Sequence, residues 1–152
     1  MNPRVYVETS IISYLSGRPS REVVIAAHQA LTRRWWRSRR DYNLVVSQFV
    51  VDEAALGDRV ASARRLRALL GIPRLAVGPE ATHVGALPKR ATVDAFHIGV
   101  AAAHQVDYLL TWNCKHLANA KMRSTIEVTC RSAGLTPPII CTPEELPSGG
   151  TL

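Results

Sequence analysis

The amino-acid sequence predicts an α/β fold in which a central parallel β-sheet carries helices on both faces. Short apolar runs, typical of buried strands, alternate with longer segments in which apolar residues recur every three or four positions. The connections between them are short, which favours parallel strands joined by right-handed crossovers. The length of 152 residues suits one domain with a substantial core. We predict this domain over residues 1–146 and a loose tail over 147–152.

The individual elements follow from periodicity and from start and stop residues. The predicted strands are short and apolar, and they lie at 5–7, 43–47, 74–77, 106–111 and 139–141. The predicted helices lie after residue 8, at 20–40, 48–56, 59–70, 80–87, 95–105 and 114–120, and in a further segment ending near 132. A single capped turn is expected at 142–146. In helix 20–40 the expected buried face is Val24, Ala27, Leu31 and Trp35.

Charge and composition restrict the function classes. The net charge is +7, and 16 of the 19 basic residues are arginine. The planar guanidinium group binds phosphate oxygens and stacks on bases, so the excess favours a nucleic-acid partner, although a GC-rich genome would also supply many arginine codons. No apolar run reaches the roughly 18 residues of a membrane span, and the N-terminus does not resemble a secretory signal, so we expect a cytoplasmic protein without membrane contact.

Other common sites have no matching motif. The three cysteines Cys114, Cys130 and Cys141 form no Cys-x-x-Cys unit, which argues against a zinc ribbon and against a disulfide framework. Cys114 and His116 lack a second pair of ligands for zinc. The sequence also lacks the glycine-rich loops of nucleotide-binding proteins and the Gly-x-Ser-x-Gly motif of serine hydrolases.

Polar residues at the ends of predicted strands mark the candidate site. In open parallel sheets the ligand lies beyond the carboxyl ends of the strands. Glu8 follows the first strand, Asn113 follows strand 106–111, Asp94 begins a helix, and Glu53 lies one or two turns into the helix after the second strand. Oxygen ligands without cysteine suit Mg²⁺ or Mn²⁺. The competing interpretation is that these side chains are helix caps or solvated surface charges.

Further residues are candidates for supporting roles. Hydroxyl groups beside the strand ends are expected to hold the carboxylates in place, and they belong to Thr9, Ser10 and Thr111. His97 lies one turn after Asp94; it either leans toward the site or, as we expect, is a histidine satisfied within the fold. The basic segment 31–40 predicts RNA contact by Arg33, Arg34 and Arg37, with a solvated or partner-docking face as the alternative, and the same question applies to Arg59, Arg64, Arg65 and Arg67.

Four segments together resemble a known family, and they occur in its order and with its spacing. They are Val-Tyr-Val-Glu-Thr-Ser at 5–10, Ser-Gln-Phe-Val-Val-Asp-Glu at 47–53, Asp-Ala-Phe-His-Ile-Gly-Val-Ala-Ala at 94–102 and Asp-Tyr-Leu-Leu-Thr-Trp-Asn at 107–113. The sequence resembles the PIN-domain ribonucleases, and among them the VapC-like toxins of bacterial toxin–antitoxin pairs. The resemblance extends over residues 1–146 and implies a three-layer PIN-like sandwich.

The resemblance also implies an activity. It implies an endoribonuclease dependent on Mg²⁺ or Mn²⁺, forming a homodimer and inhibited by a small antitoxin, with Glu8, Glu53, Asp94 and Asn113 as metal-binding and catalytic residues. Two positions depart from the family pattern: Glu8 replaces an aspartate, and Asn113 replaces an acidic residue, with His116 where a related aspartate often stands. These departures leave open the alternative that the fold binds RNA or a protein partner without turnover.

Overall fold

The structure is a computed structural model that describes residues 1–79, 92–113 and 120–146, apart from the side chains of 92–94 and 120–122. The described residues form a five-stranded sheet in the order β3-β2-β1-β4-β5. Each neighbouring pair of strands is parallel. The predicted class, α/β with a central parallel sheet, is therefore confirmed.

The strands occupy the predicted places with small differences at their ends. They are β1 (Arg4–Val7), β2 (Asn43–Ser47), β3 (Arg74–Leu75), β4 (Tyr108–Leu110) and β5 (Ile139–Cys141). β1 lies at the centre of the sheet, and its Val5, Tyr6 and Val7 are fully buried. A strand that is buried on both faces reads as a continuous apolar run, which explains why the sequence indicated it.

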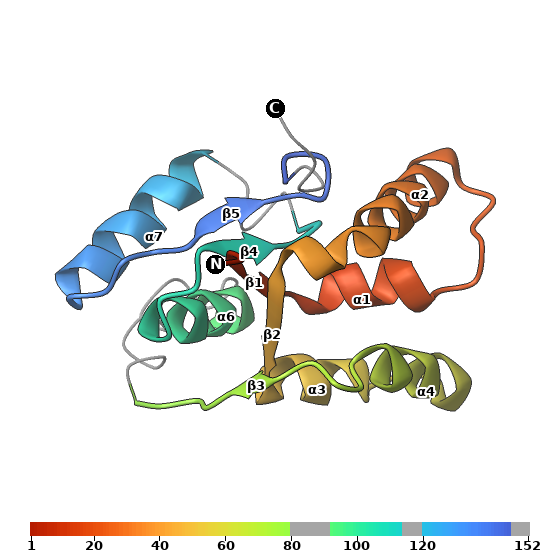
Figure 1. Ribbon diagram of the computed structural model, residues 1–152, viewed down its shortest axis with the longest axis horizontal. Helices are drawn as coiled ribbons and strands as arrows, with labels where there is room; N and C mark the ends of the chain where they lie inside the picture. Colours follow the sequence, from red (N-terminus) through yellow and green to blue (C-terminus); the bar gives the residue numbers. More distant parts are fainter. Residues whose placement is uncertain (80–91, 114–119, 147–152) are drawn as a thin grey trace.

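The helices form two groups. They are α1 (Thr9–Ser16), α2 (Val23–Arg37), the 3₁₀ turn η1 (Arg39–Asp41), α3 (Gln48–Ala54), α4 (Arg59–Ala68), α6 (Thr92–Ala103) and α7 (Ala120–Ser132). α1 contacts α2, α3 and α4, whereas α6 contacts α7. Figure 1 shows the first group on one side of the strands and the second group on the other. Helices therefore cover both sides of the sheet, as parallel pairing with right-handed crossovers requires.

Local signals in the sequence set several of these boundaries. Asp58 accepts a hydrogen bond from the Ala61 backbone N–H (2.9 Å) and begins α4. Gly71 follows the helix with a φ of 81°, a left-handed conformation that favours glycine. The capped turn at 142–146 is also confirmed, because the backbone N–H groups of Thr142 and Glu145 each donate to the other residue's side chain. The predicted helices at 80–87 and 114–120 and the tail 147–152 lie wholly or almost wholly outside the described residues.

The buried face of α2 differs from the prediction. Val24 is 66% exposed and Ala27 is also exposed, so the first half of the expected apolar stripe does not face the core, whereas Leu31 and Trp35 pack into it. The buried residues of α2 are Gln29, Thr32 and Trp35. Polar side chains can occupy this face because they have hydrogen-bond partners there: Gln29 bonds to the backbone of Arg18 and Ser20, and Thr32 bonds to Trp112. A hydrophobic periodicity does not reveal such partners. The prediction was correct for Leu31 and Trp35 and wrong for Val24 and Ala27.

One of these polar partners joins α2 to the end of β4. The Trp112 indole N–H donates to the Thr32 hydroxyl (2.7 Å), and that hydroxyl donates to the backbone carbonyl of His28 (2.6 Å). Thr32→Val keeps the shape of the side chain but leaves the indole N–H without an acceptor. We expect a loss of about 1–3 kcal/mol in the free energy of unfolding, measured by urea denaturation.

The Trp112→Phe background provides the control for Thr32→Val. Phenylalanine has no N–H to satisfy, so Thr32→Val should cost clearly less in that background than in the parent protein. Equal costs in the two backgrounds would show that the hydrogen bond between Trp112 and Thr32 contributes nothing measurable to stability.

Candidate metal centre

The candidate site lies where the direction of chain winding reverses in the sheet. After β1 the chain adds β2 and β3 on one side of β1, whereas after β4 it adds β5 on the opposite side of the sheet. β1 and β4 are adjacent, and Val7 pairs with Leu110 at their carboxyl ends. Ligands of doubly wound sheets bind at this kind of reversal, because the connecting segments diverge there and leave the strand ends accessible.

Glu8 is fixed at the first of these strand ends. It is the N-cap of α1 and only 5% exposed. Its Oε2 accepts hydrogen bonds from the Ser10 backbone N–H (2.9 Å), the Ser10 hydroxyl and the Thr111 hydroxyl (2.9 Å). The predicted contacts of Ser10 and Thr111 with a carboxylate are therefore present, and they connect the ends of β1 and β4.

The two hydroxyl groups are themselves oriented by the backbone. The Trp112 N–H donates to the Ser10 hydroxyl (2.9 Å), and the Asn113 N–H donates to the Thr111 hydroxyl (3.0 Å). Each hydroxyl thus accepts from a backbone N–H group and donates to Glu8 Oε2. The carboxylate of Glu8 is thus held in one orientation by the segment that follows β4.

Glu53 approaches the same place from α3. Its side chain is 32% exposed, and its Oε1 accepts from the Thr9 hydroxyl (2.9 Å) and contacts His97 Nε2 (2.5 Å). Burial raises the pKa of Glu53, but hydrogen bonds from His97 and Thr9 and attraction to the His97 ring outweigh burial and lower its pKa below the usual range. Glu53 is therefore a carboxylate at neutral pH.

A buried chain of hydrogen bonds supports Glu53 from behind. His97, Tyr6 and Ser47 are fully buried, and the Tyr6 hydroxyl lies 2.6 Å from both the Ser47 hydroxyl and His97 Nδ1. His97 Nε2–H donates to the Glu53 carboxylate, and the Tyr6 hydroxyl shares hydrogen bonds with His97 Nδ1 and with the Ser47 hydroxyl. Burial raises the pKa of Tyr6; the hydrogen bond with Ser47 lowers it in part and the charges of Glu8 and Glu53 raise it again, so the pKa stays above the usual range and the hydroxyl keeps its proton.

These side chains form a group with the chemistry of a cation site. One ligand atom each from Glu8, Glu53 and His97 lies within 4.8 Å of the others. Among the described residues, no hydrogen bond reaches Glu8 Oε1 or Glu53 Oε2, because the supporting contacts use Glu8 Oε2 and Glu53 Oε1. Each carboxylate thus keeps one oxygen available, and two such oxygens suit a hard cation such as Mg²⁺ or Mn²⁺.

The other two predicted ligands are Asp94 and Asn113. Asp94 lies in the first turn of α6, one turn before His97. Its side chain is not among those that the structure describes. Asn113 follows β4 at the same edge as Glu8, and its side chain is partly buried. The structure therefore brings Glu8 and Glu53 together and places Asn113 at the same sheet edge.

His97 and its two supporting residues were not predicted as part of the site. We expected a histidine satisfied within the fold, and its two ring nitrogens are both in hydrogen-bond contact. It also belongs to the group that could hold a cation. The available signal was its position one turn after Asp94, but a histidine at that spacing does not reveal which residue it contacts. Tyr6 and Ser47 gave no signal because both lie within apolar strands.

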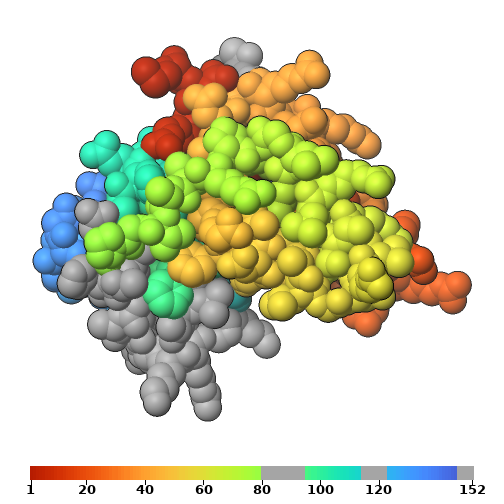
Figure 2. All heavy atoms as spheres, turned by 90° about the horizontal axis from the view of Figure 1, so that it is seen from below, coloured from red at the N-terminus to blue at the C-terminus, as the bar shows by residue number. Residues whose placement is uncertain are grey.

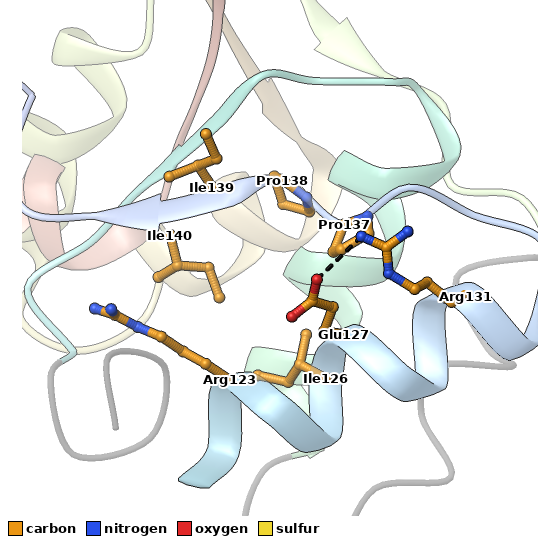
Figure 3. Close-up of a pocket in the computed structure, with 8 residues that line it drawn as sticks. All are labelled: Arg123, Ile126, Glu127, Arg131, Pro137, Pro138, Ile139 and Ile140. Carbon is orange, nitrogen blue, oxygen red and sulfur yellow. Dashed lines mark hydrogen bonds and ion pairs between the residues drawn. The ribbon is translucent and has the colours of Figure 1, made fainter. Parts of the chain in front are cut away.

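A separate cavity lies between α7 and β5 and does not join this group. It has a volume of about 310 Å³ and is lined in part by Ile126, Ile140 and Arg123 (Figure 3). Its carboxylate, Glu127, is paired with Arg131 at 3.0 Å. With its acidic group already neutralised, this cavity offers no comparable cation site.

The arginines predicted to contact RNA have different surroundings. Arg34 and Arg37 on α2 are exposed, whereas Arg33 is partly buried and its Nη2 donates to the Gly17 carbonyl (3.3 Å).

Within the described part of the chain, no helix is both long enough and apolar enough to cross a membrane. Comparisons with protein-family models, with curated proteins and with solved structures found no match.

Proposed function

We propose that this protein is a metal-dependent endoribonuclease that hydrolyses RNA phosphodiester bonds with Mg²⁺ or Mn²⁺. The observation that carries the proposal is the convergence of Glu8, Glu53 and His97 at the sheet edge where β1 and β4 end. Two carboxylates in such proximity repel each other, and a divalent cation between them would remove that repulsion. The fold thus supplies a place for a cation at the position where such sheets bind ligands.

The residues fit a hard cation in their donor chemistry. Glu8 Oε1 and Glu53 Oε2 would hold the ion, and Asp94 and Asn113 are proposed as further ligands from their positions in the sequence. In phosphodiester hydrolysis such an ion activates water or stabilises charge on the phosphate. Thr9, Ser10 and Thr111 would keep the carboxylates in position, because each hydroxyl already donates to one of them.

The identity of the substrate rests on charge. A net charge of +7 with 16 arginines favours a polyanion, and exposed Arg34 and Arg37 are available for phosphate contact. The narrower proposals, a PIN-like toxin of a toxin–antitoxin pair that forms a homodimer and binds a small antitoxin, rest on the resemblance of the four sequence segments. We likewise propose a cytoplasmic location.

A cleavage assay tests the proposed activity. Purified protein is incubated with single-stranded RNA and Mg²⁺ or Mn²⁺, and parallel reactions contain EDTA. We expect cleavage with either metal and none with the chelator. RNA binding without cleavage under any metal condition would contradict the enzyme and support a binding module of the same fold, and cleavage that persists in EDTA would contradict the metal dependence.

A further inference from the structure

A basic cavity lies between the C-terminal end of α1 and the first two turns of α4, from its N-cap Asp58 to Arg65. Its volume is about 400 Å³. Figure 2 shows the atoms of α4 beside those of the segment that follows α1, at one end of the molecule. The polar residues of its lining are three arginines, two serines and one aspartate, namely Arg18, Arg64, Arg65, Ser13, Ser16 and Asp58. The lining therefore carries more positive than negative charge.

Two of the three arginines are available to a ligand. Arg65 is held in place, because its guanidinium group donates to the Ala54 carbonyl (2.9 Å) and to the Leu56 carbonyl. Arg18 and Arg64 make no side-chain hydrogen bond or ion pair with any described residue. Their guanidinium groups can donate to the oxygens of a phosphate without first breaking an existing contact.

The acidic member of the lining is already engaged. Asp58 is the N-cap of α4, and its carboxylate accepts from the Ala61 backbone N–H (2.9 Å). The partial positive charge at the start of a helix compensates a carboxylate in this position. The charge of Asp58 therefore opposes an anion in the cavity less than a free carboxylate would.

The cavity is connected to the candidate metal centre through two helices. Glu8 caps one end of α1, and Ser13 and Ser16 line the cavity near the other end. At about 1.5 Å per residue, they lie roughly 8 and 12 Å further along the helix than Glu8. The Ala54 carbonyl that holds Arg65 belongs to the residue after Glu53. A strand crossing the metal centre along α1 would therefore reach the cavity.

We propose that this cavity binds a backbone phosphate of the RNA strand, a few nucleotides from the bond that is cut. Arg18 and Arg64 contact the phosphate oxygens, the Ser13 hydroxyl supplies a further donor, and Arg65 forms a fixed basic wall, whereas the Ser16 hydroxyl already donates to the Ile12 carbonyl (2.8 Å). This inference rests on the proposed function for its substrate, but binding at the cavity requires neither a metal ion nor cleavage. It assigns the contact to α1 and α4, in addition to the exposed arginines of α2.

The test measures RNA binding in EDTA, where the proposed cleavage cannot occur. The anisotropy of a labelled single-stranded RNA is titrated with the full-length protein and with Arg18→Gln and Arg64→Gln at several salt concentrations. We expect each substitution to raise Kd about tenfold, as for the loss of one charged hydrogen-bonded contact. The slope of log Kd against log salt should fall by about 0.7 for each substitution.

Arg131→Gln is the matched control. Arg131 is exposed, lies on α7, and is paired with Glu127, so its loss should leave Kd close to that of the parent. The melting temperature of each variant verifies that it is folded. Unchanged Kd and unchanged salt slope for both Arg18→Gln and Arg64→Gln would overturn the proposal, and so would a parent protein that binds no RNA.

Inorganic phosphate distinguishes an RNA site from a site for the free ion. Phosphate should compete with RNA for the parent and compete less for Arg64→Gln. Competition by phosphate, combined with RNA affinities that neither substitution changes, would assign the cavity to free phosphate and contradict the RNA site. Substitutions that weaken RNA binding in a protein that never cleaves would leave the phosphate site standing and contradict only the proposed nuclease.

Discussion

Glu8→Gln should reduce metal-dependent RNA cleavage by at least about 100-fold while the protein stays folded. The glutamine carbonyl can take the place of Glu8 Oε2 and still accept from Ser10 and Thr111. The amide nitrogen then occupies the position of Oε1, where it supplies neither charge nor a lone pair to a cation. Glu53→Gln should have the same effect, because its carbonyl can still accept from Thr9 and His97.

The measurement is the initial rate of cleavage over a range of Mg²⁺ and Mn²⁺ concentrations, together with urea unfolding of each variant. Glu22→Gln is the matched control, because Glu22 lies at the start of α2, is exposed, and makes no side-chain capping bond. It should cleave like the parent. Parental rates for Glu8→Gln or Glu53→Gln would show that the cleaving activity does not come from this group of residues.

Tyr6→Phe should lower both stability and activity, because the Tyr6 hydroxyl has two buried partners. Its loss leaves Ser47 Oγ and His97 Nδ1 without their contact in a fully buried place. We expect a loss of about 1–3 kcal/mol in the free energy of unfolding. Because His97 supports Glu53, we also expect cleavage to fall by about 10-fold or more at subsaturating metal. Urea unfolding and metal-dependent rates measure the two effects.

Tyr14→Phe is the matched control for this substitution. Tyr14 is partly buried and packs edge-on against His28 and Trp112, but its hydroxyl makes no hydrogen bond to a described residue. Its removal should therefore change stability and cleavage little. If Tyr6→Phe unfolds and cleaves like Tyr14→Phe, the buried chain from Ser47 to Glu53 does not position the carboxylate.

The sheet could be predicted because its strands bury apolar residues on both faces. The segment at 43–47 was predicted with the limits that β2 has, and the strands predicted at 5–7 and 106–111 are present as the neighbouring parallel strands β1 and β4. Alternation of strands with helices restricts the topology, because parallel neighbours need a crossover between them. The sheet edge that carries Glu8 and Asn113 follows from that topology alone.

The helix faces and the buried polar contacts could not be predicted in the same way. On α2 the core accepts Gln29 and Thr32, which are held by hydrogen bonds, whereas apolar Val24 remains exposed. The contact between His97 and Glu53 depends on how α3 and α6 are placed relative to each other. The sequence of neither helix alone predicts that placement. Periodicity reports which residues are apolar, but it does not report which polar residues find partners.

Anomalous scattering can locate a metal ion at the ends of β1 and β4. A crystal of the protein soaked in Mn²⁺ should give an anomalous difference peak at the ends of β1 and β4. We expect the peak at roughly 2.0–2.6 Å from carboxylate oxygens of Glu8 and Glu53. Absence of a peak there at saturating Mn²⁺, in a protein that still cleaves RNA, would show that Glu8 and Glu53 do not hold the catalytic cation.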